Sequence, residues 1–371
     1  MQLSLRDPSG ACHLVVLAKR TYALERGRLI LAAEQLPIRD DLVFDGDELL
    51  HDTDTVPMKL RTDLVIQGHA YGQGRSQFEA RVSVNDKVAK RILVLGDREC
   101  ITDSGGHIFI APPLPVDKVP LRYTHAYGGV AARTLDGVPE DRAENVRMMA
   151  TALEMPPEEL IASRYPRNPA GRGWLLKPTL EAVAKLQLPN LEDPLDRLTP
   201  ERLAVGDEHD WATMPLPQST GWQSYGAFPR LAYVGFGIVG NRPAKPIAEV
   251  ERGYYPENLL DPKTPAEMQL VANGASPGLQ FPHFRGGETI ALDNMHPKYA
   301  SLSITLPTGK PKMWVDGRKG TLKETEPVIH TVVVEPDLDR VSILWRGSAP
   351  ALRPYMAHEL EKMPFKVEWS D

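Results

Sequence analysis

The side-chain types that could bind a metal come closest together between His283 and His296, with Asp293 between them. Imidazole and carboxylate groups are ligands that zinc and iron accept. The spacing matches no diagnostic metal motif, because a glycine pair and a predicted strand separate the three residues. Hydrogen-bonded histidines near a loop are the favoured interpretation. A metal-dependent hydrolase that uses His283, Asp293 and His296 is the alternative hypothesis.

Sequence motifs of nucleophilic catalysis and nucleotide binding give no strong evidence for an enzyme. We predict no nucleophile elbow between a strand and a helix, no phosphate-binding loop and no H-E-x-x-H helix. Gly235 to Gly240 have the spacing of a dinucleotide-binding turn, but prolines interrupt any helix that would follow. Asp97 and Arg98 could form a catalytic pair, although a structural ion pair at a strand end is commoner. We therefore expect a protein that is not an enzyme, with no cofactor and no bound metal.

The composition is that of a globular protein rich in short strands and turns. Of the 371 residues, 34 are proline and 29 are glycine, which disfavours long helices. The net charge of −6 is well mixed, whereas nucleic-acid binding requires a clustered basic face. No apolar run approaches the length of a membrane span, and no signal peptide is evident. We predict a cytoplasmic protein that binds no nucleic acid and does not insert into a membrane.

Two cysteines, Cys12 and Cys100, lie far apart in the chain. Buried, reduced thiols are the favoured interpretation. A single disulfide is the alternative, and it would require an oxidising compartment.

The clearest strand pattern covers residues 77–95. Phe78, Ala80, Val82 and Val84 alternate with polar residues, as expected for a strand with one buried face. A turn at 85–86, an Asn-Asp pair, returns the chain through a second strand, since both residue types tolerate left-handed backbone conformations. An earlier strand over 64–70 would complete an antiparallel meander of three strands.

Strand patterns recur at both ends of the chain, and helix patterns lie between them. Near the N-terminus we predict a hairpin turn at 25–28, and near the C-terminus a second meander from 301 to 345. Helices are predicted over 140–153, from 156 and over 178–188, the first with Met149 and Leu153 on its apolar face. The predicted class is a β-rich α+β fold, with antiparallel meanders or sandwich-like sheets at both ends and a helical insertion in the middle. The predicted regions are 1–130, 131–265 and 266–371.

Residues 36–58 are rich in carboxylates and lack periodicity. A carboxylate cluster suggests calcium, but the spacing does not match a known calcium loop. We expect an irregular, solvated acidic loop.

Several short motifs occur in a fixed order along most of the chain. They are Lys59-x-x-Thr62-Asp63, Gly96-Asp97-Arg98, Tyr127-Gly128-Gly129, Tyr165-Pro166-x-Asn168-Pro169-x-Gly171-x-Gly173, Leu188-Pro189-Asn190-Leu191-Glu192, Asn273-x-Ala275-x-Pro277, Val334-x-Pro336-Asp337 and Leu344-Trp345-Arg346-Gly347. In this order they resemble a bacterial family that was first filed as a domain of unknown function. Members of that family sit in type VI secretion gene clusters and act as adaptors that load toxic effectors onto the needle's spike.

The resemblance implies a non-catalytic adaptor whose partner is a secreted effector, a spike protein or a tip protein. Trp and Tyr often anchor protein interfaces, and the proline-rich middle of the chain is dense in both. The candidate partner-binding residues are Tyr165, Arg172, Trp174, Trp222 and Tyr225. Packing of the insertion onto the sheet is the alternative role for the same side chains. A glycan-binding β module that uses Trp174, Trp211 and Trp222 is a further alternative.

Overall fold

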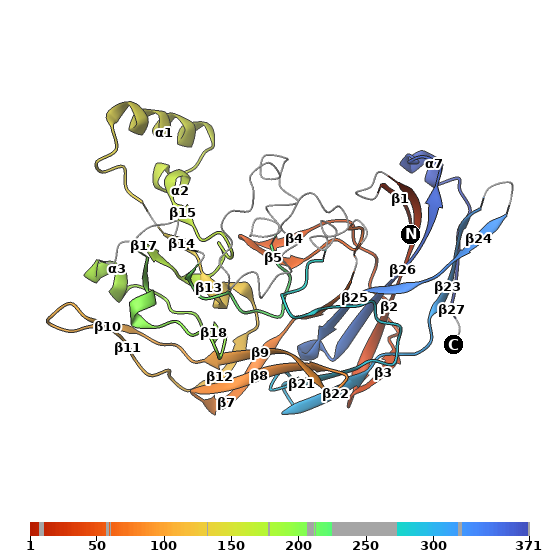
Figure 1. Ribbon diagram of the computed structural model, residues 1–371, viewed down its shortest axis with the longest axis horizontal. Helices are drawn as coiled ribbons and strands as arrows, with labels where there is room; N and C mark the ends of the chain where they lie inside the picture. The colour runs from red at the N-terminus through yellow and green to blue at the C-terminus, as the bar shows by residue number, and fades with distance from the viewer. Residues whose placement is uncertain are drawn as a thin grey trace.

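The computed structural model describes residues 1–6, 11–56, 59, 61–131, 133–176, 179–205, 211, 213–224, 273–317 and 321–369. Two large β-sheets dominate these residues, and the predicted β-rich α+β class is confirmed (Figure 1). The glycine-rich segment 235–240 lies outside the described residues.

The larger sheet has seven strands from both ends of the chain. They are β1 (Gln2–Arg6), β2 (Cys12–Glu25), β3 (Arg28–Leu31), β6 (Thr62–Ile66), β20 (Gln280–Phe281), β25 (Val328–Glu335) and β26 (Arg340–Ala351). The strand order is β1-β2-β26-β25-β6-β20, and β3 pairs with β2 beside this path. Every pairing is antiparallel except that of β25 with β6, which is parallel.

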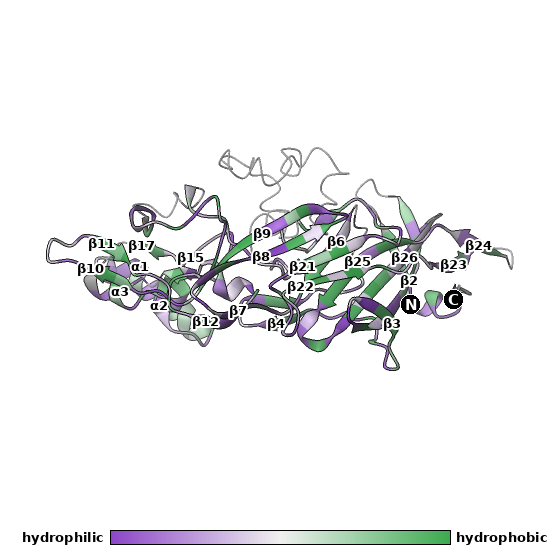
Figure 2. Cartoon of the chain, turned by 90° about the horizontal axis from the view of Figure 1, so that it is seen from below, coloured by the Kyte–Doolittle hydropathy of each residue, from purple (hydrophilic) through white to green (hydrophobic). Residues whose placement is uncertain are grey.

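The second sheet has five strands in the order β18-β9-β8-β21-β22. Its members are β8 (Gln77–Val84), β9 (Lys87–Leu95), β18 (Leu191–Glu192), β21 (Thr289–Asp293) and β22 (Ser301–Thr305). Side chains from both sheets, such as Val82 and Ile343, belong to one hydrophobic core. Figure 2 shows hydrophobic residues alternating with hydrophilic ones along these strands. The predicted N-terminal and C-terminal β regions therefore contribute to the same two sheets and the same core.

Smaller elements surround this frame. A three-stranded sheet contains β23 (Pro311–Asp316), β24 (Leu322–Thr325) and β27 (Lys366–Trp369). The strand pairs are β4 (Val43–Asp45) with β5 (Glu48–His51), β7 (His69–Arg75) with β12 (Val116–Pro120), β10 (Cys100–Thr102) with β11 (Ile108–Ile110), β13 (Tyr127–Gly128) with β16 (Arg172–Gly173), β14 (Val130–Ala131) with β15 (Ser163–Arg164), and β17 (Leu175–Leu176) with β19 (Ala204–Val205). The described helices are α1 (Glu140–Ala152), α2 (Pro157–Ile161), α3 (Leu180–Ala184), α7 (Ala357–Leu360), η1 (Tyr123–His125), η2 (Pro200–Arg202) and η6 (Pro336–Leu338).

The predicted hairpin over 77–95 is confirmed in both register and turn. Phe78, Ala80, Val82 and Val84 are buried, whereas the residues between them are only partly buried. The turn residues at 85 and 86 both have positive φ, as the two central positions of a hairpin turn require. The predicted meander of three strands is wrong, however. The segment 62–75 divides into β6, which pairs in the larger sheet, and β7, which pairs with β12.

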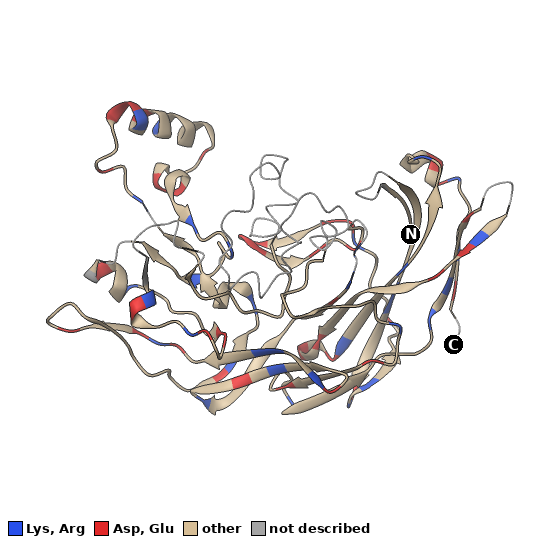
Figure 3. Ribbon diagram, viewed as in Figure 1, with Lys and Arg blue, Asp and Glu red and all other residues tan. Residues whose placement is uncertain are grey.

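The acidic region at 36–58 is also more ordered than predicted. It contains the hairpin of β4 and β5, which carries acidic residues (Figure 3), and these residues pair with arginines from other parts of the chain. Arg122 contacts Asp45 at 2.7 Å and Glu48 at 2.8 Å, and Arg164 contacts Asp47 at 2.5 Å. These carboxylates therefore link the hairpin to Arg122 and to Arg164 of the insertion, while Asp45 and Asp47 remain exposed to solvent as predicted.

A buried ion pair fixes the start of β6. Lys59 Nζ lies 2.7 Å from Asp63 Oδ2, and both side chains are almost fully buried. The same carboxylate accepts hydrogen bonds from Asn273 Nδ2 at 2.9 Å and from the backbone nitrogen of Gly274 at 2.9 Å. Asp63 thus joins β6 to Asn273 and Gly274, which lie more than 200 positions later in the chain.

Lys90 on β9 predicts a pH dependence of stability. Its ammonium group donates to the carbonyl oxygen of Pro277 at 2.9 Å, and burial lowers the pKa of Lys90 from 10.5 to about 7. The unfolded chain therefore binds this proton more tightly than the folded chain does. As a result, the contribution of Lys90 to the free energy of unfolding rises as the pH increases above about 7.

We expect the wild type to gain about 2 kcal/mol of unfolding free energy relative to Lys90→Met between about pH 7 and about pH 9. Urea unfolding of both proteins across this range measures the difference. Parallel pH profiles for the two proteins would contradict the prediction.

Candidate partner-binding surface

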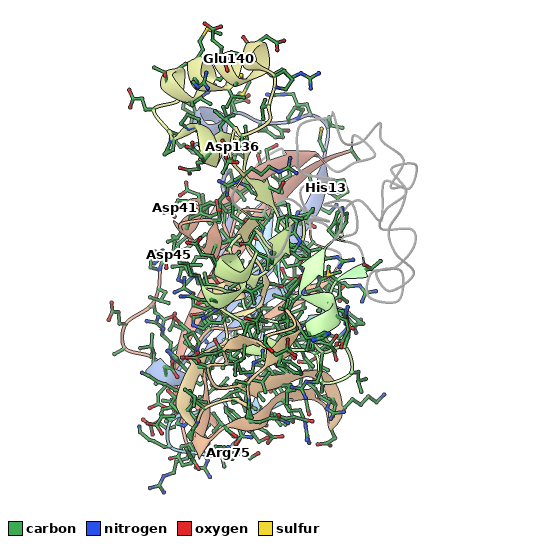
Figure 4. The ribbon with its side chains drawn as sticks, turned by 90° about the vertical axis from the view of Figure 1, so that its left-hand side faces the viewer. His13, Asp41, Asp45, Arg75, Asp136 and Glu140 are labelled. Carbon is green, nitrogen blue, oxygen red and sulfur yellow. The ribbon has the colours of Figure 1, made fainter. Side chains whose placement is uncertain are left out.

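Helix α1 lies outside both large sheets (Figure 1), and some of its apolar side chains are exposed. Glu140 and Asp141 occupy its first turn, where carboxylates favour the positive end of the helix. Figure 4, in which Glu140 is labelled, shows the helix standing clear of the β frame. The predicted helix is confirmed over 140–152.

Only part of the apolar side chains of this helix is buried. Ala143 and Ala150 are buried, but Met148, Met149 and Leu153 have exposed fractions of 64%, 53% and 58%. Met149 and Leu153 are four residues apart and so lie on the same side, whereas Met148 is turned by about 100° from Met149 around the helix. Contiguous exposed apolar groups often mark protein-binding sites, and flexible methionines adapt to varied partner shapes. We call these three residues the α1 patch.

A groove is lined by two chain segments that pair with each other in parallel and then pair with different strands. Tyr127 and Gly128 of β13 pair with Arg172 and Gly173 of β16, and the backbone nitrogen of Trp174 donates to the carbonyl oxygen of Gly128 at 3.0 Å. Beyond this point β14 pairs with β15, whereas β17 pairs with β19. The resulting cavity, which we call the wedge groove, has a volume of about 960 Å³.

A glycine is required where the two segments separate. Gly129 has a φ of +116°, and a β-carbon at this position would lie 2.7 Å from the carbonyl oxygen of Gly171. Any larger residue would therefore clash with the opposing backbone and force the segments apart. The glycines in two of the ordered sequence motifs thus allow the close approach at the base of the wedge groove.

Three of the predicted partner-binding residues meet at the base of the wedge groove. Arg172 and Trp174 line it, and Tyr165 packs against Trp174 with ring centroids 5.6 Å apart. Tyr165 and Trp174 are buried, at 0% and 4% exposure, so they belong to a second hydrophobic core and present no aromatic surface. Arg172 is half-buried and donates from Nε to the carbonyl oxygen of Thr124 at 3.0 Å.

The other two predicted residues lie elsewhere. Trp222 is buried in the main core, where Lys59 Nζ lies 5.2 Å from the centre of its ring. Tyr225 lies outside the described residues. The described aromatics among them pack the interior, which was the alternative role. Met149 and Leu153 were predicted as the apolar face of a helix but not as partner-binding residues.

The residues of the metal hypothesis each have a separate partner. His283 Nδ1 lies 3.3 Å from the carbonyl oxygen of Ile329, and His296 Nε2 lies 2.9 Å from Asp339 Oδ1. Asp293 lies 3.9 Å from a guanidinium nitrogen of Arg81. Within the described part of the chain, no three histidine, cysteine or acidic residues are grouped to hold a metal ion. The structure therefore does not bring His283, Asp293 and His296 together as a ligand set.

The glycan hypothesis requires exposed aromatic faces from three tryptophans. Trp174 and Trp222 are each 4% exposed. Trp211 is half-buried, and the guanidinium carbon of Arg167 lies 4.9 Å from the centre of its ring. These three side chains do not form a common sugar-stacking platform.

Contrary to the prediction, the letters of a nucleophile elbow do occur, at residues 274–278. Their serine, Ser276, is completely buried and its hydroxyl oxygen accepts a hydrogen bond from the hydroxyl of Tyr123 at 3.1 Å. A nucleophilic serine must be exposed at a strand-to-helix turn. Ser276 is followed instead by the short strand β20, so it fixes the packing of η1 against this segment.

A contact between His69, Tyr71 and Asp337 also escaped the sequence analysis. His69 Nδ1 lies 2.6 Å from Asp337 Oδ2, and the hydroxyl of Tyr71 donates to Asp337 Oδ1 at 2.8 Å. Burial and this hydrogen bond raise the pKa of Tyr71. The cluster links β7 to η6, the turn between β25 and β26, and no local pattern reveals it because the residues are so distant in sequence.

Cys12 and Cys100 are not bonded to each other, and burial raises the pKa of the Cys100 thiol. None of the described helices combines the length and the hydropathy that crossing a membrane requires.

A family model described as an uncharacterized protein conserved in bacteria, DUF2169, matches residues 9–346. No curated protein matches the chain. No solved structure matches it either.

Proposed function

The chain belongs to the bacterial family DUF2169, and from this premise we propose that it is a non-catalytic adaptor of type VI secretion. In this role it binds a toxic effector, or the tip domain that travels with it, in the cytoplasm and loads it onto the spike. Firing of the loaded spike then releases the cargo, so the adaptor needs no chemistry of its own. The link to type VI secretion is supported by the resemblance of the ordered motifs.

Several motif residues hold the frame together, as an adaptor scaffold requires. Arg98 contacts Glu192 at 2.6 Å with both side chains buried. Asn168 Nδ2 donates to the carbonyl oxygens of Tyr123 at 2.8 Å and Tyr127 at 3.0 Å. Such contacts join distant segments and supply rigidity, which leaves the outer surface available for recognition.

The observation that carries the protein-binding role is the α1 patch. An isolated apolar side chain on a surface is ordinary, but three exposed ones within six residues of a helix that lies outside both sheets favour a protein partner. An interface of standard size, roughly 1,200–2,000 Å² in total, would need neighbouring surface in addition to the patch. The polar residues of α1, such as Arg147 and Glu140, would then form part of its rim.

The first test is co-purification with the effector encoded beside this gene. The wild type should retain the effector, and the triple variant Met148→Ser, Met149→Ser, Leu153→Ser should lose it. Because all three side chains are exposed, we expect the variant to remain folded, with each substitution changing stability by about 0.5 kcal/mol or less. A control replaces by serine two exposed apolar residues, Leu352 and Met356, in the segment that leads into α7, which lies at the opposite end of the structure from α1 (Figure 1).

Deletion of the gene should stop delivery of that effector while the needle still assembles. Continued delivery without the gene, or failure of the whole needle to assemble, would show that the adaptor assignment is wrong.

A further inference from the structure

We propose that α1 and α2 bind a basic amphipathic helix of the protein partner. The proposal rests on the adaptor function, and it names the chemical class of the segment that the α1 patch would contact. Both helices lie in the segment from Glu140 to Ile161, which we call the acidic arm and which lies outside both large sheets (Figure 1).

The acidic arm has a large excess of negative charge. It contains six carboxylates and two arginines, a net charge of −4, whereas the whole chain has a net charge of −6. Figure 3 shows acidic residues on both α1 and α2. A partner segment rich in lysine or arginine would complement this charge. The carboxylates, all of them exposed, are Glu140, Asp141, Glu144, Glu154, Glu158 and Glu159.

Little of this charge is neutralised within the protein. Arg147 lies 2.7 Å from Glu140, but both side chains are largely exposed, so the pair is weak. The other five carboxylates form no ion pair with any residue that the structure describes. Glu140 and Glu144 are four residues apart on α1, so their like charges repel each other on the same side of the helix. Basic groups of a partner would remove this repulsion.

The α1 patch lies between two groups of carboxylates along the chain. Met148 comes four residues after Glu144, so the two side chains lie on the same side of α1. Leu153 is followed directly by Glu154, and the first turn of α2 contains two further acids. Protein interfaces commonly have an apolar centre and a polar rim, and here the rim is acidic.

The form of the patch favours a helix as the occupant. Met149 and Leu153 are four residues apart and form a ridge of the kind that packs into a groove on the surface of a second helix. Among the described elements α1 packs mainly against α2, and Ala143 and Ala150 are its buried residues. Helices as short as these two are marginally stable by themselves in water. A third helix would bury Met149 and Leu153 and so stabilise the acidic arm.

The test selects random peptides of about 16 residues, roughly four helical turns, displayed on phage, against the full chain. We expect the selected peptides to carry a net positive charge and apolar residues spaced three and four positions apart. One of them, synthesised with a fluorescent label, reports affinity by anisotropy. A proline in the middle of this peptide should abolish binding, because proline breaks a helix.

The arm variant Glu144→Gln, Glu154→Gln, Glu158→Gln removes three charges and nearly preserves the size of each side chain. It should weaken peptide binding about tenfold, as expected for three exposed ion pairs. Raising the salt concentration from about 50 mM to about 500 mM should weaken binding by the wild type severalfold, because salt screens exposed charges. The serine variant of the α1 patch should weaken binding at least about tenfold, because it removes the apolar contacts.

A matched control makes the same three charge changes at the opposite end of the structure from α1 (Figure 1). Its substitutions are Glu324→Gln on β24, Glu326→Gln after β24 and Glu361→Gln after α7, all at exposed positions. It should leave peptide binding unchanged. Selection of no peptide, selection of acidic or uncharged peptides, or equal binding by the arm variant and the control would overturn the proposal.

The outcomes also separate this proposal from the adaptor function. If the arm variant loses the peptide but gene deletion leaves effector delivery intact, the acidic arm remains a peptide site and the adaptor function falls. If no basic peptide binds the acidic arm but effector capture and delivery still depend on the chain, the adaptor function stands and the basic helix falls.

Discussion

Replacing Asp63 by alanine should lower the free energy of unfolding by about 3–5 kcal/mol, because it leaves the buried ammonium group of Lys59 without its counter-ion. The substitution also removes the acceptor for Asn273 Nδ2 and for the backbone nitrogens of Gly274 and Ala275. Unfolding in guanidinium chloride, followed by tryptophan fluorescence, measures the loss.

The double variant Lys59→Met, Asp63→Leu separates the cost of the unpaired Lys59 charge from the cost of the lost hydrogen-bond acceptor. It removes both charges together, so we expect it to recover a substantial part of the lost stability. Lys185→Ala is the matched control, since its ion pair with Glu181 is exposed and should contribute at most about 1 kcal/mol. Equal stability of Asp63→Ala and the wild type would show that the buried pair does not stabilise the fold.

The second large effect is expected at Gly96, which follows β9. A β-carbon at this position would lie 1.8 Å from the carbonyl oxygen of Leu114, so the two backbones would have to separate. Hydrogen bonds on both sides resist that movement. The backbone nitrogen of Gly96 donates to the carbonyl oxygen of Ser76 at 2.9 Å, and the backbone nitrogen of Leu114 donates to the carbonyl oxygen of Asp97 at 3.0 Å. Gly96→Ala should cost about 3 kcal/mol, at the upper end for overpacking.

Gly221→Ala is the control for this substitution. The nearest atom to a β-carbon there is Ser219 Oγ at 3.5 Å, an ordinary van der Waals contact. Its backbone conformation is also one that alanine accepts, so the change should be neutral or stabilise by up to about 1 kcal/mol. Thermal unfolding of the two variants beside the wild type gives the comparison. Similar melting temperatures for both variants would exclude the close approach at Gly96.

The features that the sequence predicted well are those decided by neighbouring residues. The hairpin over 77–95 follows from side-chain alternation and from two turn residues, and both act within a few positions. The pairing of β6 with β25 could not be predicted in this way, because its partners are about 270 positions apart. Strand patterns show that each segment pairs, but they do not say with which other segment.

The difference between local patterns and distant contacts also explains which parts of the candidate site could be predicted. Periodicity indicated which side chains of α1 are alike, but it could not show that Met149 and Leu153 are more than half exposed. Residue type also does not separate an interface anchor from a core residue. Trp174 and Tyr165 are large aromatics of the kind that anchor interfaces, and the second core uses them to fill its interior.

The larger sheet combines strands from both ends of the chain, and this has a consequence for synthesis on the ribosome. β2 emerges early, but its long partner β26 begins only at Arg340. The pairing of β2 with β26 therefore cannot form until more than three hundred further residues have been translated. At roughly 5–20 residues per second, this interval is on the order of tens of seconds. During that time β2 and β6 expose hydrophobic faces and unpaired edges, which favour association with other nascent chains. Chaperones that shield such segments should therefore raise the yield of folded protein, and chains terminated before β26 should aggregate or be degraded.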